Sequence, residues 1–457
     1  MSFVNWLTNS NKIKADSICR YRWEQVVIQF NRAEIRTCCR TYPAIKITDA
    51  DLQSHGSDVF LNHPNLLERR QEMLIGKKHS TCDECWVIEK SGSKSFRKNE
   101  YLNTRNEIID YFKNVSNADT QHSDHPLIQK LSYSYKPTSL VLFLSNVCDL
   151  KCAYCYYGLS TSWSQENVQF NELSDSQKKD LKPTVPDQFE TEFWNWFEST
   201  CVHLEHIGFT GGEPTLSPHF ERFLDRIIKT LDQKNKKLTL SINTNFNYSD
   251  SKKDTVFKTF QKASLAGHTF CIDVSVDGLN EQGDYIRNGL SHQQWMKNFE
   301  ELLSMKLPVN IGISPTVNVL IGPSLKGLIE KIFDYQIKFN TPINLCQNIV
   351  AKPEKMSPYI LRPSDLQPFL EVIEYIHQAV VKLKAIGFID SANSWSRYAD
   401  FLQNMITTVQ HNQNKNLCVA RLDLIDYLEK NDRKRNTDYL KTFPELKSFF
   451  NFCKEQK

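Results

Sequence analysis

The sequence predicts an α/β protein whose centre is a partial (β/α)6 TIM-like barrel. From residue 139 onward, apolar runs rich in Val, Ile and Phe alternate with segments of helical periodicity, the pattern of successive βαβ units. The alternation stops after the sixth run, at a proline-punctuated connection over 353–363. The flanks differ, because 1–136 is irregular and the chain after 364 reads as helices. We therefore predict three domains, an N-terminal module at 1–136, the barrel at 137–352 and a helical C-terminal extension at 353–457.

Each predicted strand is a short run of β-branched and aromatic residues bounded by turn residues. The six runs are 139–145, 206–210, 238–243, 270–276, 309–317 and 343–349. Five helical segments separate them, at 187–202, 219–233, 255–265, 292–305 and 324–335. We favour an open barrel, and a doubly wound sheet is the alternative. The long polar segment at 158–182 is either a functional insertion or a surface loop.

The composition indicates a soluble globular protein. Of 457 residues, 40% are hydrophobic and 24% are charged, and 56 Lys and Arg against 53 Asp and Glu give a net charge of +3. This balance argues against a dominant nucleic-acid-binding surface. No run approaches the ~20 apolar residues of a membrane span, and 1–14 lacks the apolar core of a signal peptide. We therefore expect a cytoplasmic protein without a membrane partner.

The cysteines are numerous and unevenly placed. There are 13, an odd number, in a chain without an evident secretory signal, which argues against a disulfide framework. Five of them occur singly and are expected to be small buried hydrophobes: Cys201, Cys271, Cys346, Cys418 and Cys453. The other eight fall into an N-terminal group and a tight triplet, and both groups call for a metal.

The triplet Cys148, Cys152 and Cys155 directly follows the first strand of the barrel. In a barrel this is the C-terminal face, where the loops that follow strands build active sites. Three thiolates within eight residues suit an iron–sulfur cluster, because thiolates are soft ligands that bind iron. A helix that buries the three cysteines and a zinc site are the alternatives, although no histidine lies nearby to complete a zinc site.

The spacing C-x3-C-x2-C, with Tyr154 before the last cysteine, resembles the signature of radical S-adenosylmethionine (SAM) enzymes. After the second strand, Gly211-Gly212-Glu213 is similar to the GGE motif of that family. Two glycines allow a close backbone approach to a ligand, and a carboxylate and carbonyls can receive an ammonium group. The resemblance spans about 137–350. It implies that the triplet holds a [4Fe–4S] cluster and that the GGE motif binds the methionine amino group of SAM.

Small polar residues lie at the ends of the third and fourth strands. The resemblance implies that they contact the ribose and the methionine carboxylate of SAM, and the residues concerned are Asn243, Ser275 and Asp277. Asp277-Gly278 also reads as a plain turn. Asn318, after the fifth strand, is expected either to reach adenosine or substrate or to serve core packing.

The N-terminal group contains Cys19, adjacent Cys38 and Cys39, and the pair Cys82-Asp-Glu-Cys85. Four of these thiolates can complete one closed metal site, and their spacing alone fits structural zinc and iron–sulfur equally. The pattern resembles the twitch and SPASM modules of radical SAM enzymes, although those modules usually follow the barrel. The resemblance implies one auxiliary [4Fe–4S] cluster held by Cys19, Cys38, Cys82 and Cys85, with Cys39 as the alternative to Cys38.

The resemblance implies a radical SAM oxidoreductase or modifying enzyme. An electron from the reduced cluster would cleave SAM to a 5′-deoxyadenosyl radical that abstracts hydrogen from a substrate. The expected electron donor is a flavodoxin or ferredoxin. We favour a peptide or protein side chain as substrate, followed by a sugar or small polyol, and assign no catalytic side chain. The alternative class is a zinc-knuckle nucleic-acid-binding protein, but its basic cluster at 430–435 is better interpreted as a solvated helix end.

Overall fold

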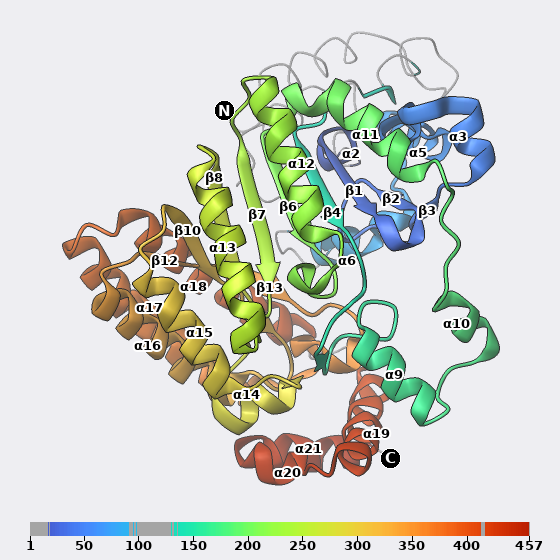
Figure 1. Cartoon of the computed structure of the whole chain (residues 1–457). Helices are drawn as coiled ribbons and strands as arrows, with labels where there is room; N and C mark the ends of the chain where they lie inside the picture. Colours follow the sequence, from blue (N-terminus) through green and yellow to red (C-terminus); the bar gives the residue numbers. More distant parts are fainter. Residues whose placement is uncertain are drawn as a thin grey trace. The chain divides into compact units, whose positions relative to one another are not determined.

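A computed structural model describes residues 17, 19–90, 95, 97, 129, 132–134, 136–412 and 416–456 (Figure 1). Most of 1–18 and 91–131, and the centre of the predicted loop at 411–416, lie outside these residues. Nine strands form one sheet in the order β12-β10-β8-β7-β6-β4-β1-β2-β3. Their bounds are β1 (Gln25–Gln29), β2 (Glu34–Arg36), β3 (Ile45–Lys46), β4 (Ser139–Phe143), β6 (His206–Thr210), β7 (Thr239–Thr244), β8 (Thr269–Val274), β10 (Val309–Ile313) and β12 (Ile343–Leu345). The predicted parallel α/β architecture is confirmed, with three additional N-terminal strands.

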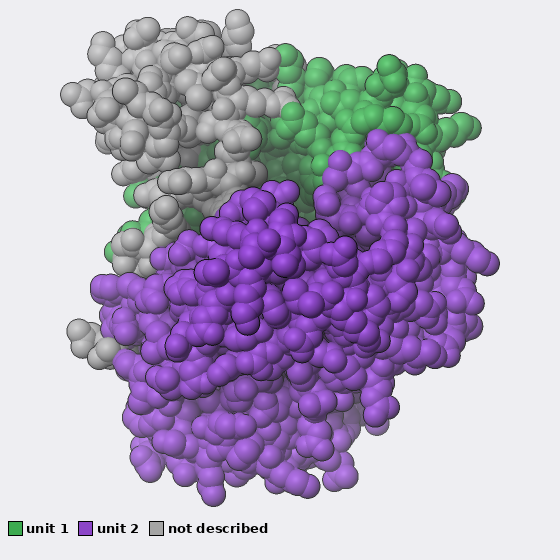
Figure 2. Space-filling model, turned by 90° about the vertical axis from the view of Figure 1, so that its left-hand side faces the viewer, with its two compact units in different colours: residues 1–145, 182–210, 225–239 green, residues 146–181, 211–224, 240–457 purple. Residues whose placement is uncertain are grey.

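The chain divides into two compact units, coloured separately in Figure 2. The first contains 1–145, 182–210 and 225–239, and the second contains 146–181, 211–224 and 240–457. The helix α12 (Phe220–Gln233) belongs partly to each.

The first unit extends a parallel core with N-terminal strands. β4 pairs in parallel with β6 on one side and with β1 on the other, and β2 and β3 continue the sheet in antiparallel order. β1 belongs there because Val26, Val27 and Ile28 are all buried. Aromatic rings pack between the N-terminal segment and α11 (Phe189–Thr200), where the ring centroids of Phe30 and Phe193 lie 4.8 Å apart. The other helices of this unit are α2 (Tyr21–Glu24), α3 (Asp49–His55), α4 (Val59–Asn62), α5 (Pro64–Leu74) and α6 (Asp83–Lys90).

The second unit contains the parallel ladder of β8, β10 and β12. The predicted strand at 309–317 ends early, because Pro315 has no N–H for the ladder. The predicted strand at 343–349 is also divided, between β12 and a second short strand. Their last residues form a separate pair, β11 (Thr316–Val317) with β13 (Asn348–Ile349). The helices between strands are α13 (Asp250–Leu265), α14 (Asn280–Ile286), α15 (His292–Ser304) and α16 (Gly322–Phe339).

The C-terminal part of the second unit is helical, as predicted. It contains α17 (Gln367–Ala385), α18 (Ile389–His411), α19 (Cys418–Arg435), α20 (Tyr439–Thr442) and α21 (Lys447–Lys454). Figure 1 shows α16, α17 and α18 side by side. The long polar segment after β4 forms two short helices, α9 (Thr161–Gln169) and α10 (Asp175–Asp180). Within the described ranges, no helix is long and apolar enough to cross a membrane.

Candidate active site

The loop after β4 carries the cysteine triplet and is fixed at both ends. Its short strand β5 (Lys151–Cys152) pairs with β9 (Arg287–Asn288) in antiparallel fashion. The amide of Cys148 donates to the Thr161 hydroxyl at 3.1 Å, and the amide of Cys155 donates to the Cys152 carbonyl at 2.9 Å. The backbone therefore holds all three cysteines on one ordered loop, with Cys152 buried and the other two half-buried.

The chemistry of this donor set fits an iron–sulfur cluster. Burial raises the pKa of Cys152 to about 11 and that of Cys155 to about 12, and it raises the pKa of Cys148 further. A charge on Cys152 raises the pKa of both other thiols, because like charges oppose each other's ionisation. Bound metal cations would reverse this preference for the protonated thiols, since coordination to a metal deprotonates a thiol. Among the described residues, no group of three or more His, Cys, Asp or Glu is arranged to hold a single metal ion.

The GGE turn packs directly on the cysteine loop. Gly211 has φ 135°, a conformation that side chains disfavour. A Cβ on Gly212 would lie 2.3 Å from the Val147 carbonyl oxygen, so only glycine fits there. The amide of Glu213 donates to the same carbonyl at 2.7 Å. Both glycines are therefore needed to bring the turn against the residue that precedes Cys148.

The Glu213 carboxylate lies at the centre of a buried hydrogen-bond network. One oxygen accepts from the Thr215 hydroxyl at 2.7 Å and from the Thr244 hydroxyl at 2.9 Å, and the other accepts from the Asn245 amide at 2.7 Å. Its side chain is 1% exposed. Burial raises the pKa of Glu213 to about 7, and the hydrogen bonds oppose this shift only in part. Glu213 therefore joins the GGE turn to the end of β7.

We expect this carboxyl to make the stability of the ligand-free protein depend on pH. The unfolded chain releases the proton near the ordinary value of 4.5 and the folded chain near 7, so the folded state binds more protons between these values. Stability should therefore fall by about 3 kcal/mol as the pH rises from about 4.5 to about 7. Unfolding curves from pH 5 to 8 should show this slope, and Glu213→Gln should remove it. An unchanged slope in that variant would contradict the assignment.

A second buried network surrounds Cys152. Asp277 accepts hydrogen bonds from the Tyr154 hydroxyl at 2.5 Å, from Nε of Arg287 at 2.9 Å and from the Thr316 amide at 2.7 Å. The Arg287 guanidinium also donates to the sulfur of Cys152 at 3.8 Å. Asp277 thus positions a cation beside the cysteine loop. This arrangement gives Tyr154 and Asp277 a structural partner in Arg287, a residue to which no sequence motif points.

Two of the three predicted strand-end residues lie on the less buried face of the strands, whereas Asp277 is buried. Asn243 is exposed and Ser275 is half-buried, while the neighbouring Thr244 and Val274 point into buried surroundings. The loop is also held by Asn245, whose side chain donates to Asp149 at 2.7 Å. Asn318 is fully buried, and its side chain accepts from the Leu320 amide at 2.9 Å and donates to the Thr316 carbonyl, which favours the packing role.

Helix α19 contacts the cysteine loop. The Tyr427 hydroxyl donates to the Ala153 carbonyl at 2.6 Å, and Arg435 forms a two-pronged contact with the buried carboxylate of Glu166. The Arg435 side chain is 8% exposed. The interpretation of 430–435 as a solvated helix end is therefore wrong at its C-terminal residues, because an acidic partner compensates the buried charge. Helix α19 thus lies against part of the candidate site.

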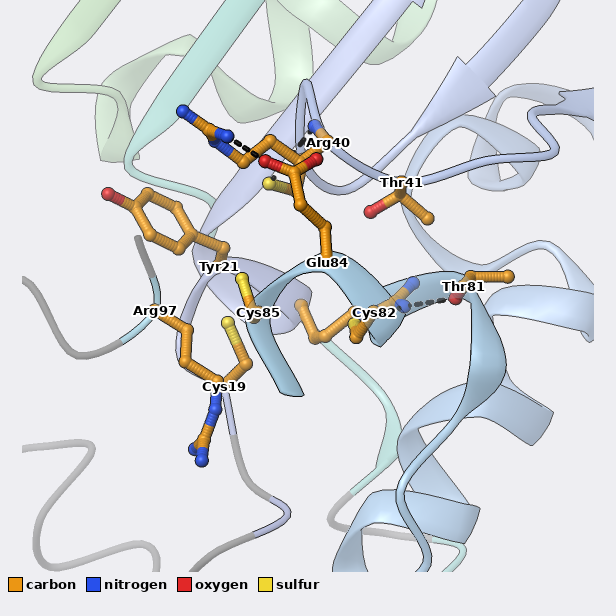
Figure 3. Close-up of a pocket in the computed structure, with 11 residues that line it drawn as sticks. Cys19, Tyr21, Arg40, Thr41, Thr81, Cys82, Glu84, Cys85 and Arg97 are labelled. Carbon is orange, nitrogen blue, oxygen red and sulfur yellow. Dashed lines mark hydrogen bonds and ion pairs between the residues drawn. The ribbon is translucent and has the colours of Figure 1, made fainter. Parts of the chain in front are cut away.

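The four N-terminal cysteines predicted as cluster ligands line a single pocket in the first unit, shown in Figure 3. Cys19 precedes α2, Cys38 follows β2, Cys82 ends a 3-10 turn and Cys85 lies in α6. Burial raises the pKa of Cys19 to about 12, and the charges of Cys82 and Cys85 add to this. Cys39 is exposed and does not line the pocket. The geometry therefore favours Cys38 over Cys39 as the fourth ligand.

Arginines surround this pocket. Arg22 is buried and donates to the sulfur of Cys82 at 3.0 Å and to the Thr37 hydroxyl at 3.1 Å. Arg40 pairs with Glu84, and Arg97 also lines the cavity. Guanidinium groups favour thiolates and offset the negative charge of a thiolate-bound cluster. The pocket therefore combines four thiols with nearby positive charge, which fits an anionic iron–sulfur group.

Residues 142–323 match the Radical SAM superfamily. This matched stretch, which is less than half of the chain, is therefore similar to a radical SAM domain, for which SAM and a [4Fe–4S] cluster are implied. The match favours the radical SAM interpretation over a zinc-knuckle nucleic-acid-binding protein.

Comparisons with solved structures give distant similarities. The structure "Native anSMEcpe with bound AdoMet and Cp18Cys peptide" has 18% identity over 55% of this chain and 62% of that chain, with a TM-score of 0.36. SuiB of Streptococcus suis, bound to S-adenosylmethionine, has 14% identity over 69% of this chain and 63% of that chain, with a TM-score of 0.35. TYW1 with a lysine-pyruvate adduct has 15% identity over 52% of this chain and 70% of that chain, with a TM-score of 0.27. This chain therefore spans less than two thirds of the length of the first two of these proteins. No curated protein matches it.

Proposed function

We propose that this protein cleaves SAM reductively and abstracts hydrogen from a peptide or protein side chain. The observation that carries the proposal is the close packing of the GGE turn on the cysteine loop, where Gly212 and Glu213 meet the Val147 carbonyl. In this proposal Cys148, Cys152 and Cys155 hold the cluster. When bound, the cluster and SAM together supply a 5′-deoxyadenosyl radical.

The chain's own residues would bind and orient SAM and exclude water. Gly211 and Gly212 would offer backbone carbonyls beside the cysteine loop, and Glu213 would fix that turn while supplying negative charge for the SAM ammonium. Asn243 and Ser275, on the less buried strand face, would contact the ribose and carboxylate. Tyr154 and Asp277 hold Arg287, a cation close to the same loop. Helix α19 shields the loop from water.

We further propose that Cys19, Cys38, Cys82 and Cys85 hold one auxiliary [4Fe–4S] cluster of a twitch or SPASM-like module. Their shared pocket and its arginines support this proposal. The auxiliary cluster would accept an electron from the substrate or anchor it. A cytoplasmic location and a flavodoxin or ferredoxin as electron donor complete the proposal.

Incubation of the anaerobically reconstituted protein with SAM and dithionite tests the function. We expect slow formation of 5′-deoxyadenosine and methionine without substrate, measured by chromatography. Glu213→Ala should weaken SAM binding and leave the iron content unchanged, because its carboxylate holds an ammonium and no metal. Methyl transfer as the sole reaction would contradict the proposal.

Deuterium transfer identifies the substrate class. Deuterated peptides should pass deuterium into 5′-deoxyadenosine, whereas deuterated sugars and polyols should not. Transfer from a polyol alone would replace the peptide assignment and leave the SAM chemistry in place.

A further inference from the structure

Strand β8 presents a polar face that continues the proposed SAM site. Phe270, Ile272 and Val274 are at most 1% exposed, whereas the alternate residues Cys271 and Asp273 are half-buried. The Ser275 amide donates to the Thr244 carbonyl at 2.8 Å. In a parallel ladder this hydrogen bond places Asp273 beside Asn243 on the neighbouring strand. Asp273 therefore lies on the face that carries the proposed SAM-binding residues.

A thiol and a carboxylate meet on this face across an intervening strand. The Cys346 sulfur, just after β12, donates to Oδ1 of Asp273 at 3.3 Å. Between them, Gly312 of β10 pairs with Asp273 in the ladder. A Cβ on Gly312 would lie 2.4 Å from that carboxylate oxygen and 3.0 Å from the sulfur. The pair therefore depends on the absence of a side chain at Gly312.

A third polar group lies near Cys346 and has no hydrogen-bond partner among the described residues. Tyr398 of α18 is fully buried, and its hydroxyl makes no hydrogen bond with any described residue. Burial raises the pKa of Tyr398, and charges on Asp277 and Cys346 raise it further. The helix is anchored here because Ser394 accepts from the Leu345 amide at 3.0 Å. A buried hydroxyl usually has a hydrogen-bond partner, and either a ligand group or a water molecule could supply one here.

The group that this site lacks is a cation. Burial raises the pKa of Asp273, and among the described residues the hydrogen bond from the Cys346 thiol counteracts this shift. Within the described part of the chain, no Lys, Arg or His pairs with this carboxylate. A half-buried carboxylate without a cation is costly, and an ammonium or guanidinium group would form a charge-assisted hydrogen bond with it. A sugar or polyol would leave the negative charge uncompensated.

We infer that Asp273, Cys346 and Tyr398 form a substrate subsite that binds an ammonium or guanidinium group. The inference rests on the proposed function, because it places the substrate beside SAM on the same strand face. It assigns the substrate to peptides that present a basic side chain, with Asp273 as the ion-pair partner. The Tyr398 hydroxyl and the Cys346 sulfur would accept the remaining N–H groups.

Protection of Cys346 from alkylation tests the subsite in the full-length reconstituted protein. Iodoacetamide modification of Cys346 is followed by mass spectrometry while a probe is titrated. The probes are the amides of Nα-acetyl-lysine, Nα-acetyl-arginine and Nα-acetyl-norleucine, together with myo-inositol. A cationic probe should protect Cys346 at concentrations about tenfold lower than norleucine amide or inositol. Equal protection by the neutral probes, or no protection by any probe, would overturn the inference.

Three variants locate the effect. Asp273→Asn should raise the protective concentration of the cationic probe about tenfold. Tyr398→Phe, which removes only an unpartnered hydroxyl, should fold normally and raise that concentration about threefold. Cys271→Ser is the matched control on the same strand face and should behave as wild type. Cationic protection that survives both Asp273→Asn and Tyr398→Phe would refute the site. Formation of 5′-deoxyadenosine by the same wild-type preparation tests the proposed function separately.

Discussion

Replacing Cys82 and Cys85 together by alanine should leave reductive SAM cleavage near normal and lower product formation on the true substrate by orders of magnitude. The two cysteines line the pocket of the first unit. The cysteine triplet, the GGE turn and Asp277 all lie in the second unit. In the proposed function, radical generation draws on residues that the substitution does not touch, whereas an interaction needed only for turnover is lost. Iron content, 5′-deoxyadenosine and product are measured in the same sample.

The matched control for this experiment is Cys39→Ala. Cys39 is exposed and lies outside the pocket, so this variant should keep its iron and its turnover. If the double variant misfolds or loses both clusters, the role of the N-terminal module is to stabilise the fold. If it cleaves SAM and turns substrate over normally, the N-terminal cluster has no catalytic part.

Replacing Cys148, Cys152 and Cys155 by alanine should remove about half of the iron and abolish SAM cleavage. The intact protein should hold about eight irons in two four-iron clusters, each bound by cysteine thiolates. The pocket lined by Cys19 and Cys38 is unaltered in this variant, so about four irons should remain. Cys418→Ser, outside both groups, is the control and should retain all iron. Full iron retention in the triple variant would refute the cluster assignment.

The fold and the local motifs were predictable from the sequence because each is encoded within a short contiguous segment. The alternation of apolar runs and helical segments identified all six barrel strands. The strand β1 was missed, because five residues within an irregular cysteine-rich segment offer no periodicity. The spacing of the triplet and the GGE motif pointed to the radical SAM domain that the family match confirms.

Other parts of the candidate site carry no local signal. Arg287 follows an unpredicted helix, and only the pairing of β5 with β9 brings it to Cys152. Cys346 was expected to be a small buried hydrophobe, yet it is half-buried and bonded to Asp273. Such contacts depend on strand register and side-chain direction, which a one-residue shift would change.

The sequence by itself determined the class of fold, the three-cysteine loop and the glycine turn, because contiguous residues encode each of them through periodicity or spacing. Only the tertiary structure decided that Cys19, Cys38, Cys82 and Cys85 line one pocket while Cys39 stays outside it. Only the tertiary structure joined Asp273 to Cys346 across Gly312. The reason is that chain folding brings together residues distant in sequence, and the available space and the register between elements select which side chains meet.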